Sequence, residues 1–64
     1  MRTDRQIIDA AIDWRRVNRP HETKPIRMHL TPKELNKALG LPGPSKGQPY
    51  PMRVLYRGFW IEAD

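Results

Sequence analysis

A proline-rich stretch, residues 41–51, divides this sequence into two parts. It contains four of the seven prolines and two of the four glycines of the 64-residue chain. Proline lacks the backbone N–H that a helix interior or a central strand needs, and its ring fixes the φ angle. We therefore expect a loop over residues 41–51, with the regular elements confined to the residues before and after it.

The N-terminal part begins with apolar side chains at helical spacing. They are Ile7, Ile8, Ala11, Ile12 and Trp14, while the charged residues Arg5, Asp9, Asp13 and Arg16 take the other side. Thr3 stands where an N-cap is expected, and Asp4 would lie in the first helical turn. Arginines gather toward the other end, where cations suit the helix dipole, before Pro20 stops the pattern. The sequence predicts a helix over residues 3–18.

Residues 26–40 predict a strand followed by a short helix. From residue 26 to residue 30 apolar and polar side chains alternate, as in a half-buried strand. Thr31 then precedes a proline at the first helical position and Glu34 at the third, which is the pattern of a capping box. Gly40 is a suitable residue to end this helix. We predict a strand over 26–30 and a helix over 32–39.

The C-terminal residues 52–63 have the pattern of a β-hairpin. A two-residue turn at Arg57 and Gly58 would pair Tyr56 with Phe59, and so on back to Met52 with Ala63. Since paired residues share a face, this register gathers Met52, Val54, Tyr56, Phe59, Ile61 and Ala63 on one apolar face. The other face then holds Arg53 beside Glu62 and Leu55 beside Trp60, and a shift of one residue would mix the two sets. Arg57 is not a favoured first residue for such a turn, which leaves a longer loop as an alternative.

Together these elements predict a single α+β domain over residues 1–64. Its order is helix, strand, helix, hairpin, with a small three-stranded, mainly antiparallel sheet packed against the N-terminal helix. Ile26, Met28 and Leu30 would join the apolar face of the sheet. A domain of this length buries only about 60% of its unfolded surface, and without cysteine it has no disulfide to add. We therefore expect a thin margin of stability.

The charge balance indicates acidic partners. Twelve Lys and Arg residues against seven Asp and Glu residues leave a net charge of +5, which argues against a mimic of DNA. No apolar run approaches the roughly 20 residues of a membrane span, and none resembles the core of a signal peptide. These features, with the lack of cysteine, favour a soluble cytoplasmic protein that does not bind membranes.

The recognisable motifs in the middle of the chain are incomplete. Residues 30–41 resemble the first helix and turn of a DNA-binding helix-turn-helix, but prolines occupy the stretch where a recognition helix would form. Residues 40–47 contain glycines and a Ser-Lys pair, yet they lack the spacing of a phosphate-binding loop and follow a helix instead of a strand. An ordinary capped helix and a surface loop are the better interpretations.

The residues that could carry catalysis or hold a metal are scattered. Asp9 and Asp13 share one side of a charged helix, as an ion-paired surface does. His21 and His29 have no neighbouring ligand at a suitable spacing, and Ser45 has no evident base. We expect no catalytic residues, no metal site and no cofactor.

The side of the hairpin opposite the apolar face is the predicted partner-binding site. Its residues are Arg27, His29, Arg53, Leu55 and Trp60, and we add the basic residues Lys46 and Arg57. Basic groups around an exposed aromatic ring can stack a base and hold phosphates, but tryptophan and arginine are also the residues favoured at protein hot spots. A third interpretation is that the second helix or the loop covers Trp60 and makes it part of the core.

The capped helix that begins at Thr31, the proline-rich loop and the closing hairpin Tyr56-Arg57-Gly58-Phe59 resemble the small proteins that tailed bacteriophages encode. This resemblance implies either a stoichiometric inhibitor of a host protein, such as a counter-defence or host-takeover factor in the host cytoplasm, or a minor structural part. It assigns no role to any residue. We predict a protein-binding inhibitor or adaptor of a host protein. The alternatives are a nucleic-acid-binding protein that uses the basic and aromatic sheet face, and a minor structural subunit of a virion or larger assembly.

Overall fold

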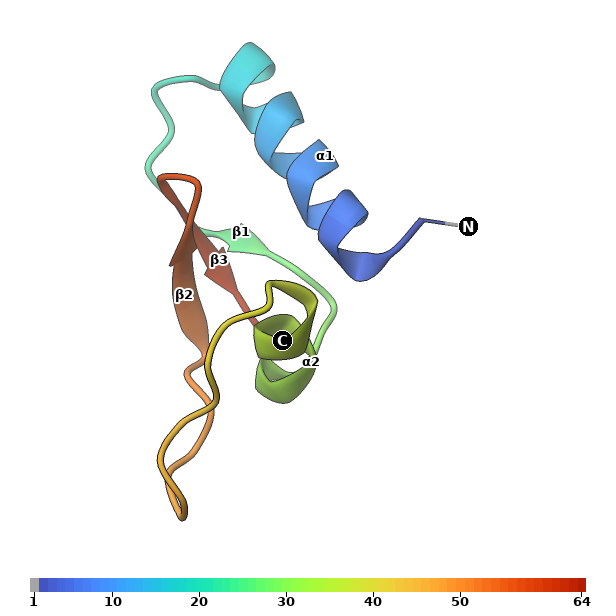
Figure 1. The fold of residues 1–64 in the computed structure, drawn as a ribbon. Coiled ribbons are helices and arrows are strands. Elements are labelled where there is room, and N and C mark those ends of the chain that lie inside the picture. The colour runs from blue at the N-terminus through green and yellow to red at the C-terminus, as the bar shows by residue number, and fades with distance from the viewer. Residues whose placement is uncertain (1) are drawn as a thin grey trace.

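The computed structural model of the chain describes residues 2–64, so that Met1 lies outside the described residues of the predicted 1–64 domain. Two helices and a three-stranded sheet form an α+β arrangement in which both helices lie toward the same side of the sheet (Figure 1). The elements follow one another in the predicted order of helix, strand, helix and hairpin.

The first helix, α1, spans Asp4–Asn18 and begins as predicted. Thr3 is its N-cap and forms a capping box with Gln6, in which each side chain accepts a hydrogen bond from the other residue's backbone N–H. Ile8 and Ile12 are fully buried, because one turn apart they point together toward the sheet. Trp14 was expected on this apolar side, but it is 56% exposed. It lies seven residues after Ile7, which is also exposed, so these two belong to a neighbouring stripe that the sheet does not cover.

The strand predicted over 26–30 is shorter, and the helix after it is close to its prediction. The strand β1 covers only Ile26–Arg27, although Met28 N still donates to Glu62 O at 2.9 Å. The helix α2 spans Pro32–Ala38, with Thr31 as N-cap and the predicted capping box. Leu39 is its C-cap, and Gly40 follows in the left-handed region at φ 65°.

The hairpin forms in the predicted register. Strands β2, Arg53–Tyr56, and β3, Phe59–Glu62, pair antiparallel. The four pairs join Arg53 to Glu62, Val54 to Ile61, Leu55 to Trp60 and Tyr56 to Phe59. Arg57 and Gly58 form the two-residue turn with φ 52° and 81°, both in the left-handed region that such turns require. The alternative of a longer loop is therefore wrong.

The sheet is mixed, which corrects the expectation of a mainly antiparallel one. Its strand order is β1-β3-β2, and β1 pairs with β3 in parallel, Ile26 opposite Ile61 and Arg27 opposite Glu62. The chain runs from β1 through α2 and the loop into β2, and then folds back so that β3 lies between the two earlier strands (Figure 1). The central strand β3 thus runs antiparallel to β2 on one side and parallel to β1 on the other.

The core gathers between the helices and one face of the sheet. Its buried apolar side chains are Ile8, Ile12, Ile26, Leu35, Leu39, Val54, Ile61 and Ala63, with Met28, Leu30, Tyr56 and Phe59 packed at its margin. Most of the predicted apolar face is confirmed by this set. Met52 is the exception, since its side chain is 54% exposed although its C=O accepts from Ala63 N as the register requires. It lies one residue before β2, at the edge of the sheet.

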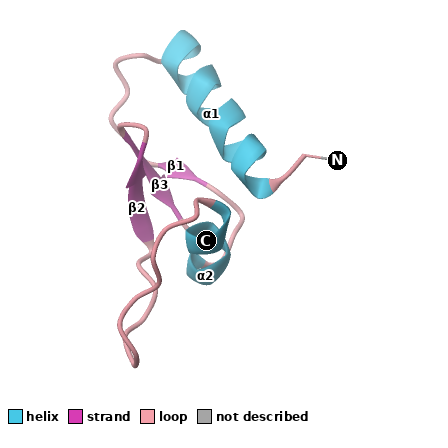
Figure 2. Cartoon of the chain, viewed as in Figure 1, coloured by secondary structure: helices cyan, strands magenta, loops and turns pink. Residues whose placement is uncertain are grey.

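The proline-rich residues 41–51 contain no helix or strand, as expected (Figure 2). They extend from the domain at the end opposite the β2–β3 turn (Figure 1). Residues 39–64 contain no further helix that could serve as a recognition helix, so the helix-turn-helix resemblance ends where the prolines begin. Within residues 2–64, no helix combines the length and the apolar character that crossing a membrane requires.

Candidate functional site

The side of the sheet away from the helices is uncovered. We call it the open face, and define it by the side chains of Arg27, Arg53, Leu55, Trp60 and Glu62. Leu55 is 57% exposed and Trp60 is 48% exposed. Neither α2 nor the loop covers Trp60, so the interpretation of this residue as core is wrong. Four of the predicted site residues, namely Arg27, Arg53, Leu55 and Trp60, therefore do share one surface.

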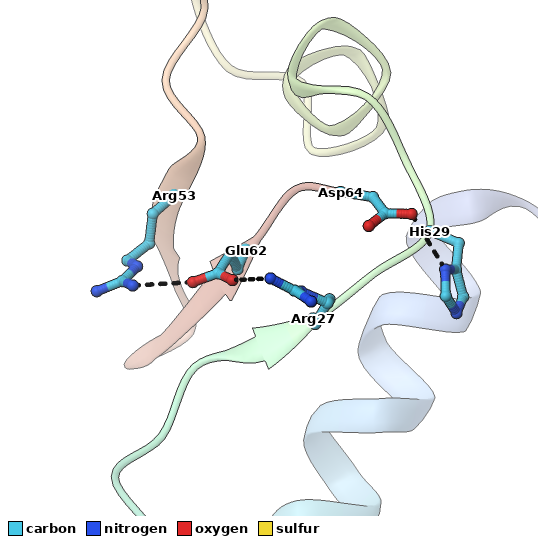
Figure 3. A network of polar contacts seen from close by, with 5 residues as sticks. All are labelled: Arg27, His29, Arg53, Glu62 and Asp64. Atoms are coloured by element: carbon cyan, nitrogen blue, oxygen red, sulfur yellow. Dashed lines mark hydrogen bonds and ion pairs between the residues drawn. The ribbon is translucent and has the colours of Figure 1, made fainter.

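The open face is organised in two rows that cross the strands. One row is apolar, with Leu55 on β2 directly opposite Trp60 on β3. The other row is charged, with Glu62 on the central strand between Arg27 and Arg53. Arg27 Nη2 donates to Glu62 Oε1 at 3.0 Å, and Arg53 Nη2 donates to Glu62 Oε2 at 2.8 Å (Figure 3). Each carboxylate oxygen thus has its own guanidinium.

These two hydrogen bonds stabilise the ionised form of the Glu62 carboxyl. The hydrogen bond from Arg53 is the main cause that lowers the pKa of the Glu62 carboxyl below its ordinary value, and the bond from Arg27 adds to it. Glu62 is therefore ionised at neutral pH, and the row carries one net positive charge shared among three groups. The sequence predicted the pair of Arg53 and Glu62, but it gave no sign that Arg27 joins them, because the parallel pairing of β1 was not foreseen.

His29 does not join the open face. It follows the end of β1, where the chain still runs beside the C-terminal residues, since Asp64 N donates to Leu30 O at 2.8 Å, and its side chain is 92% exposed. Its Nδ1 lies 3.3 Å from Asp64 Oδ2, as a pair separate from the Glu62 network (Figure 3).

The two added basic residues also lie elsewhere. Arg57 reaches toward α1, where its Nη1 is 3.2 Å from Asp9 Oδ1 and its Nη2 is 3.6 Å from Asp13 Oδ1. It therefore holds the turn against the helix and is engaged on the helix side of the sheet. Lys46 is exposed in the loop, whose tip lies far from the β2–β3 turn (Figure 1). Neither residue contributes to a continuous basic surface around Trp60.

A shallow groove borders Trp60 on the β1 side of the hairpin. It has a volume of about 460 Å³ and is lined by Pro20, Glu22, Thr23, Lys24, Gly58, Phe59 and Trp60. The guanidinium of Arg16 lies 5.9 Å from the centre of the Phe59 ring, so a cation already covers part of this aromatic side chain. The sequence pattern missed this groove, because it forms only when the link before β1 runs beside β3.

Three further acidic residues form local ion pairs. Asp9 and Asp13 hold Arg57, and Glu22 lies 3.8 Å from both Arg15 and Arg19. Within residues 2–64, no ion pair involves the lysines, which lie in the link before β1, in α2 and in the loop: Lys24, Lys33, Lys37 and Lys46. The unbalanced positive charge is thus spread around the molecule and is not concentrated on the open face.

Over residues 2–64 there is no group of three or more His, Asp or Glu side chains placed to hold a metal ion. Comparisons with protein-family models, with curated proteins and with solved structures found no match to this chain.

Proposed function

We propose that this chain is a non-catalytic protein-binding module that holds its partner through the open face. The exposed Trp60 beside Leu55, with Arg53 at one end of the pair, is the observation that supports this proposal. Tryptophan and arginine are the residues most enriched at protein hot spots, where a partner excludes water from them. A domain this small has few large apolar side chains to place in its core, so an uncovered apolar row on the sheet indicates a contact surface.

A module with one binding face acts by covering a surface of its partner, which blocks that surface or links the partner to another protein. The sequence resembles small proteins of tailed bacteriophages, and among such proteins a binding module of this kind would be an inhibitor or adaptor of a host protein in the cytoplasm. The proposal is supported by the small size of the chain, by its single uncovered sheet face and by the absence of an obvious catalytic set in its sequence. We propose no role in which a residue of the chain makes or breaks a covalent bond.

A protein partner suits the open face better than a nucleic acid does. Both arginines of the face already donate to Glu62, so the charged row carries one net positive charge, which can attract a single carboxylate of a protein partner but not a run of phosphates. The cations without ion pairs lie in other parts of the surface. Binding to nucleic acid through this face would therefore be weak and would fall steeply with salt.

The experiment that tests the proposal is affinity capture with the immobilised chain from a lysate of its native host. Trp60→Ala and Arg53→Ala should each lower the amount of captured partner at least several-fold. Trp14→Ala is the matched control, because Trp14 is similarly exposed but lies on α1, away from the open face. If both open-face variants captured as much partner as the wild type, the proposed surface would be wrong.

Two further measurements separate the alternatives. A gel-shift series on single-stranded and duplex DNA and RNA, from low to physiological salt, should show no binding that survives at physiological salt. Light scattering of the purified chain should show a monomer, whereas a protein that assembles into larger particles on its own would support a structural subunit. Binding to nucleic acid at physiological salt, lost in Trp60→Ala, would replace the protein partner with a nucleic acid.

A further inference from the structure

The outer edge of β2 carries backbone groups that no other strand covers. In the order β1-β3-β2, strand β2 stands at the end of the sheet and pairs on one side only. Met52 O accepts from Ala63 N, which shows that Met52 directs its backbone groups toward β3. In an antiparallel ladder this direction alternates along the strand. Val54 and Tyr56 therefore also face β3, whereas Arg53 and Leu55 direct both N–H and C=O outward.

The side chains of the same two residues lie on the open face. Arg53 ends the charged row that begins with Arg27 and Glu62, and Leu55 ends the apolar row that begins with Trp60. A strand added to β2 would place its own side chains directly beside them, because opposite residues share a face. The charged row alternates in sign from Arg27 to Arg53, so a carboxylate is the group that continues it. An apolar side chain continues the other row.

We propose that the outer edge of β2 pairs with a short, extended, acidic segment of the partner protein. The segment runs antiparallel to β2 and presents an apolar residue opposite Leu55 and an acidic residue opposite Arg53. From its N-terminus it therefore reads apolar, any residue, acidic. This inference rests on the proposed function and names the chemistry of the partner.

The length of the edge limits what can pair there. The strand has four residues, and Pro51 precedes it closely, so only Arg53 and Leu55 offer a regular place for a ladder. Short, charged edges of this kind resist open-ended aggregation, yet they admit a matched segment. The net charge of +5 draws an acidic segment toward the chain.

A second copy of this chain fits the edge less well. In an antiparallel pairing of two β2 strands centred on Val54, the Arg53 of each copy would lie opposite the Leu55 of the other. A charged side chain would then face an apolar one in both places, and two chains of charge +5 repel each other. The acidic segment satisfies both rows without this repulsion.

The test uses the full-length chain, labelled with nitrogen-15, and an acetylated and amidated peptide, Ser-Thr-Ile-Thr-Glu-Thr-Ser. The amide signals of Arg53 and Leu55 should shift on titration, and their hydrogen exchange should slow. A peptide with lysine in place of the glutamate should bind roughly three- to tenfold more weakly, since a favourable cross-strand charge pair becomes a repulsive one. The reversed order Glu-Thr-Ile should also bind more weakly. Binding of the reversed order with equal or higher affinity would overturn the antiparallel assignment.

Backbone pairing is tested separately by N-methylation of the peptide. The N–H groups of the isoleucine and the glutamate would face β2, and that of the threonine between them would face away. Methylation of either of the first two should weaken binding by tenfold or more, and methylation of the threonine should have little effect. Equal effects at all three positions, or no binding of any peptide at millimolar concentration, would overturn the proposal.

Two protein variants locate the contact at the correct edge. Arg53→Glu should reverse the preference, so that the lysine peptide binds more tightly than the glutamate peptide. Lys33→Glu is the matched control, since it makes the same change of charge at an exposed position of α2, away from the open face, and it should leave the preference unchanged. A concentration-dependent dimer of the chain alone, with slowed exchange at Leu55, would instead show that a second copy occupies the edge. If capture of the partner depended on Trp60 but N-methylation weakened peptide binding equally at all three positions, this inference would be overturned and the proposed function would stand.

Discussion

Tyr56 Oη donates a hydrogen bond to Asp9 Oδ1 at 2.9 Å and so joins two residues that are 47 positions apart. Arg57 Nη1 donates to the same oxygen at 3.2 Å. The turn end of the hairpin is thereby held against the middle of α1, across the margin of the core. The bond from Tyr56 is the main cause that lowers the pKa of the Asp9 carboxyl below its ordinary value, and Arg57 adds to the effect.

The lowered pKa of Asp9 predicts a stability that depends on pH. A carboxyl whose pKa is lower in the folded state stabilises the fold above its unfolded pKa of about 4, and this contribution is lost as the pH falls through the folded value. Tyr56→Phe removes the main cause of the shift, so the free energy of unfolding should fall less steeply below about pH 4 in this variant than in the wild type. Urea unfolding at a series of pH values measures this. Glu34 and Glu62 also have lowered pKa values, but they contribute equally to both proteins. Tyr50→Phe is the control, and parallel curves for Tyr56→Phe and the wild type would contradict the prediction.

Neighbouring residues on β3 should differ sharply in their effect on stability. Ile61 is fully buried against the helices, whereas Trp60 projects from the open face. Ile61→Ala should lower the free energy of unfolding by about 2–5 kcal/mol, because it leaves a cavity in the core. Trp60→Ala should lower it by about 1 kcal/mol or less. Chemical denaturation compares the two, with Ile61→Val as a milder variant if the alanine variant does not fold. A loss of more than about 2 kcal/mol for Trp60→Ala would indicate that Trp60 is packed inside.

The hairpin register was predictable from sequence because a strand has a side-chain period of two. A slip by one residue would have placed Trp60 in the core and Ile61 on the surface, and only one register separates the apolar residues from the others. The caps at Thr3 and Thr31 were also predictable, since each capping box lies within four consecutive residues. Rules that act over a few neighbouring residues were therefore enough to predict the two helices, the hairpin and the hairpin residues of the open face.

The position of β1 was not predictable by the same means. Nothing in residues 26–30 indicates which hairpin strand they will meet, because this depends on the path of the chain through α2 and the loop. The sequence therefore could not show that Glu62 would lie between Arg27 and Arg53, or that His29 would pair with Asp64 apart from this network. It also could not assign Arg57 to Asp9 and Asp13, a contact that depends on how α1 crosses the sheet.

The turn residue Arg57 should be replaceable by asparagine without loss of stability in high salt. Its φ of 52° lies in the left-handed region, which costs most residues about 1–2 kcal/mol but is tolerated by asparagine. Arg57→Asn and Arg57→Ala both remove the ion pairs to Asp9 and Asp13, and they differ in how well they accept this backbone. We expect Arg57→Asn to be more stable than Arg57→Ala by about 1 kcal/mol. In about 0.5 M salt, where exposed ion pairs are screened, Arg57→Asn should also equal or exceed the wild type. Equal stability of the two variants in denaturant would show that the turn carries no such strain.

Asn36 should control the start of the proline-rich loop. It is the buried polar residue of α2, and its Nδ2 donates to Leu41 O at 3.0 Å while its own C=O accepts from Leu41 N at 3.1 Å. Asn36→Ala leaves the carbonyl of Leu41 without this donor, which should lower the free energy of unfolding by about 1 kcal/mol or more even though alanine favours the helix. The amide of Leu41 should then exchange its hydrogen faster than in the wild type. Lys37→Ala changes the next, exposed residue of α2 and is the control for helix propensity. If Asn36→Ala left both the stability and the exchange at Leu41 unchanged, the side chain would have no part in holding the loop, and residues 41–51 would have to be ordered by contacts other than this one.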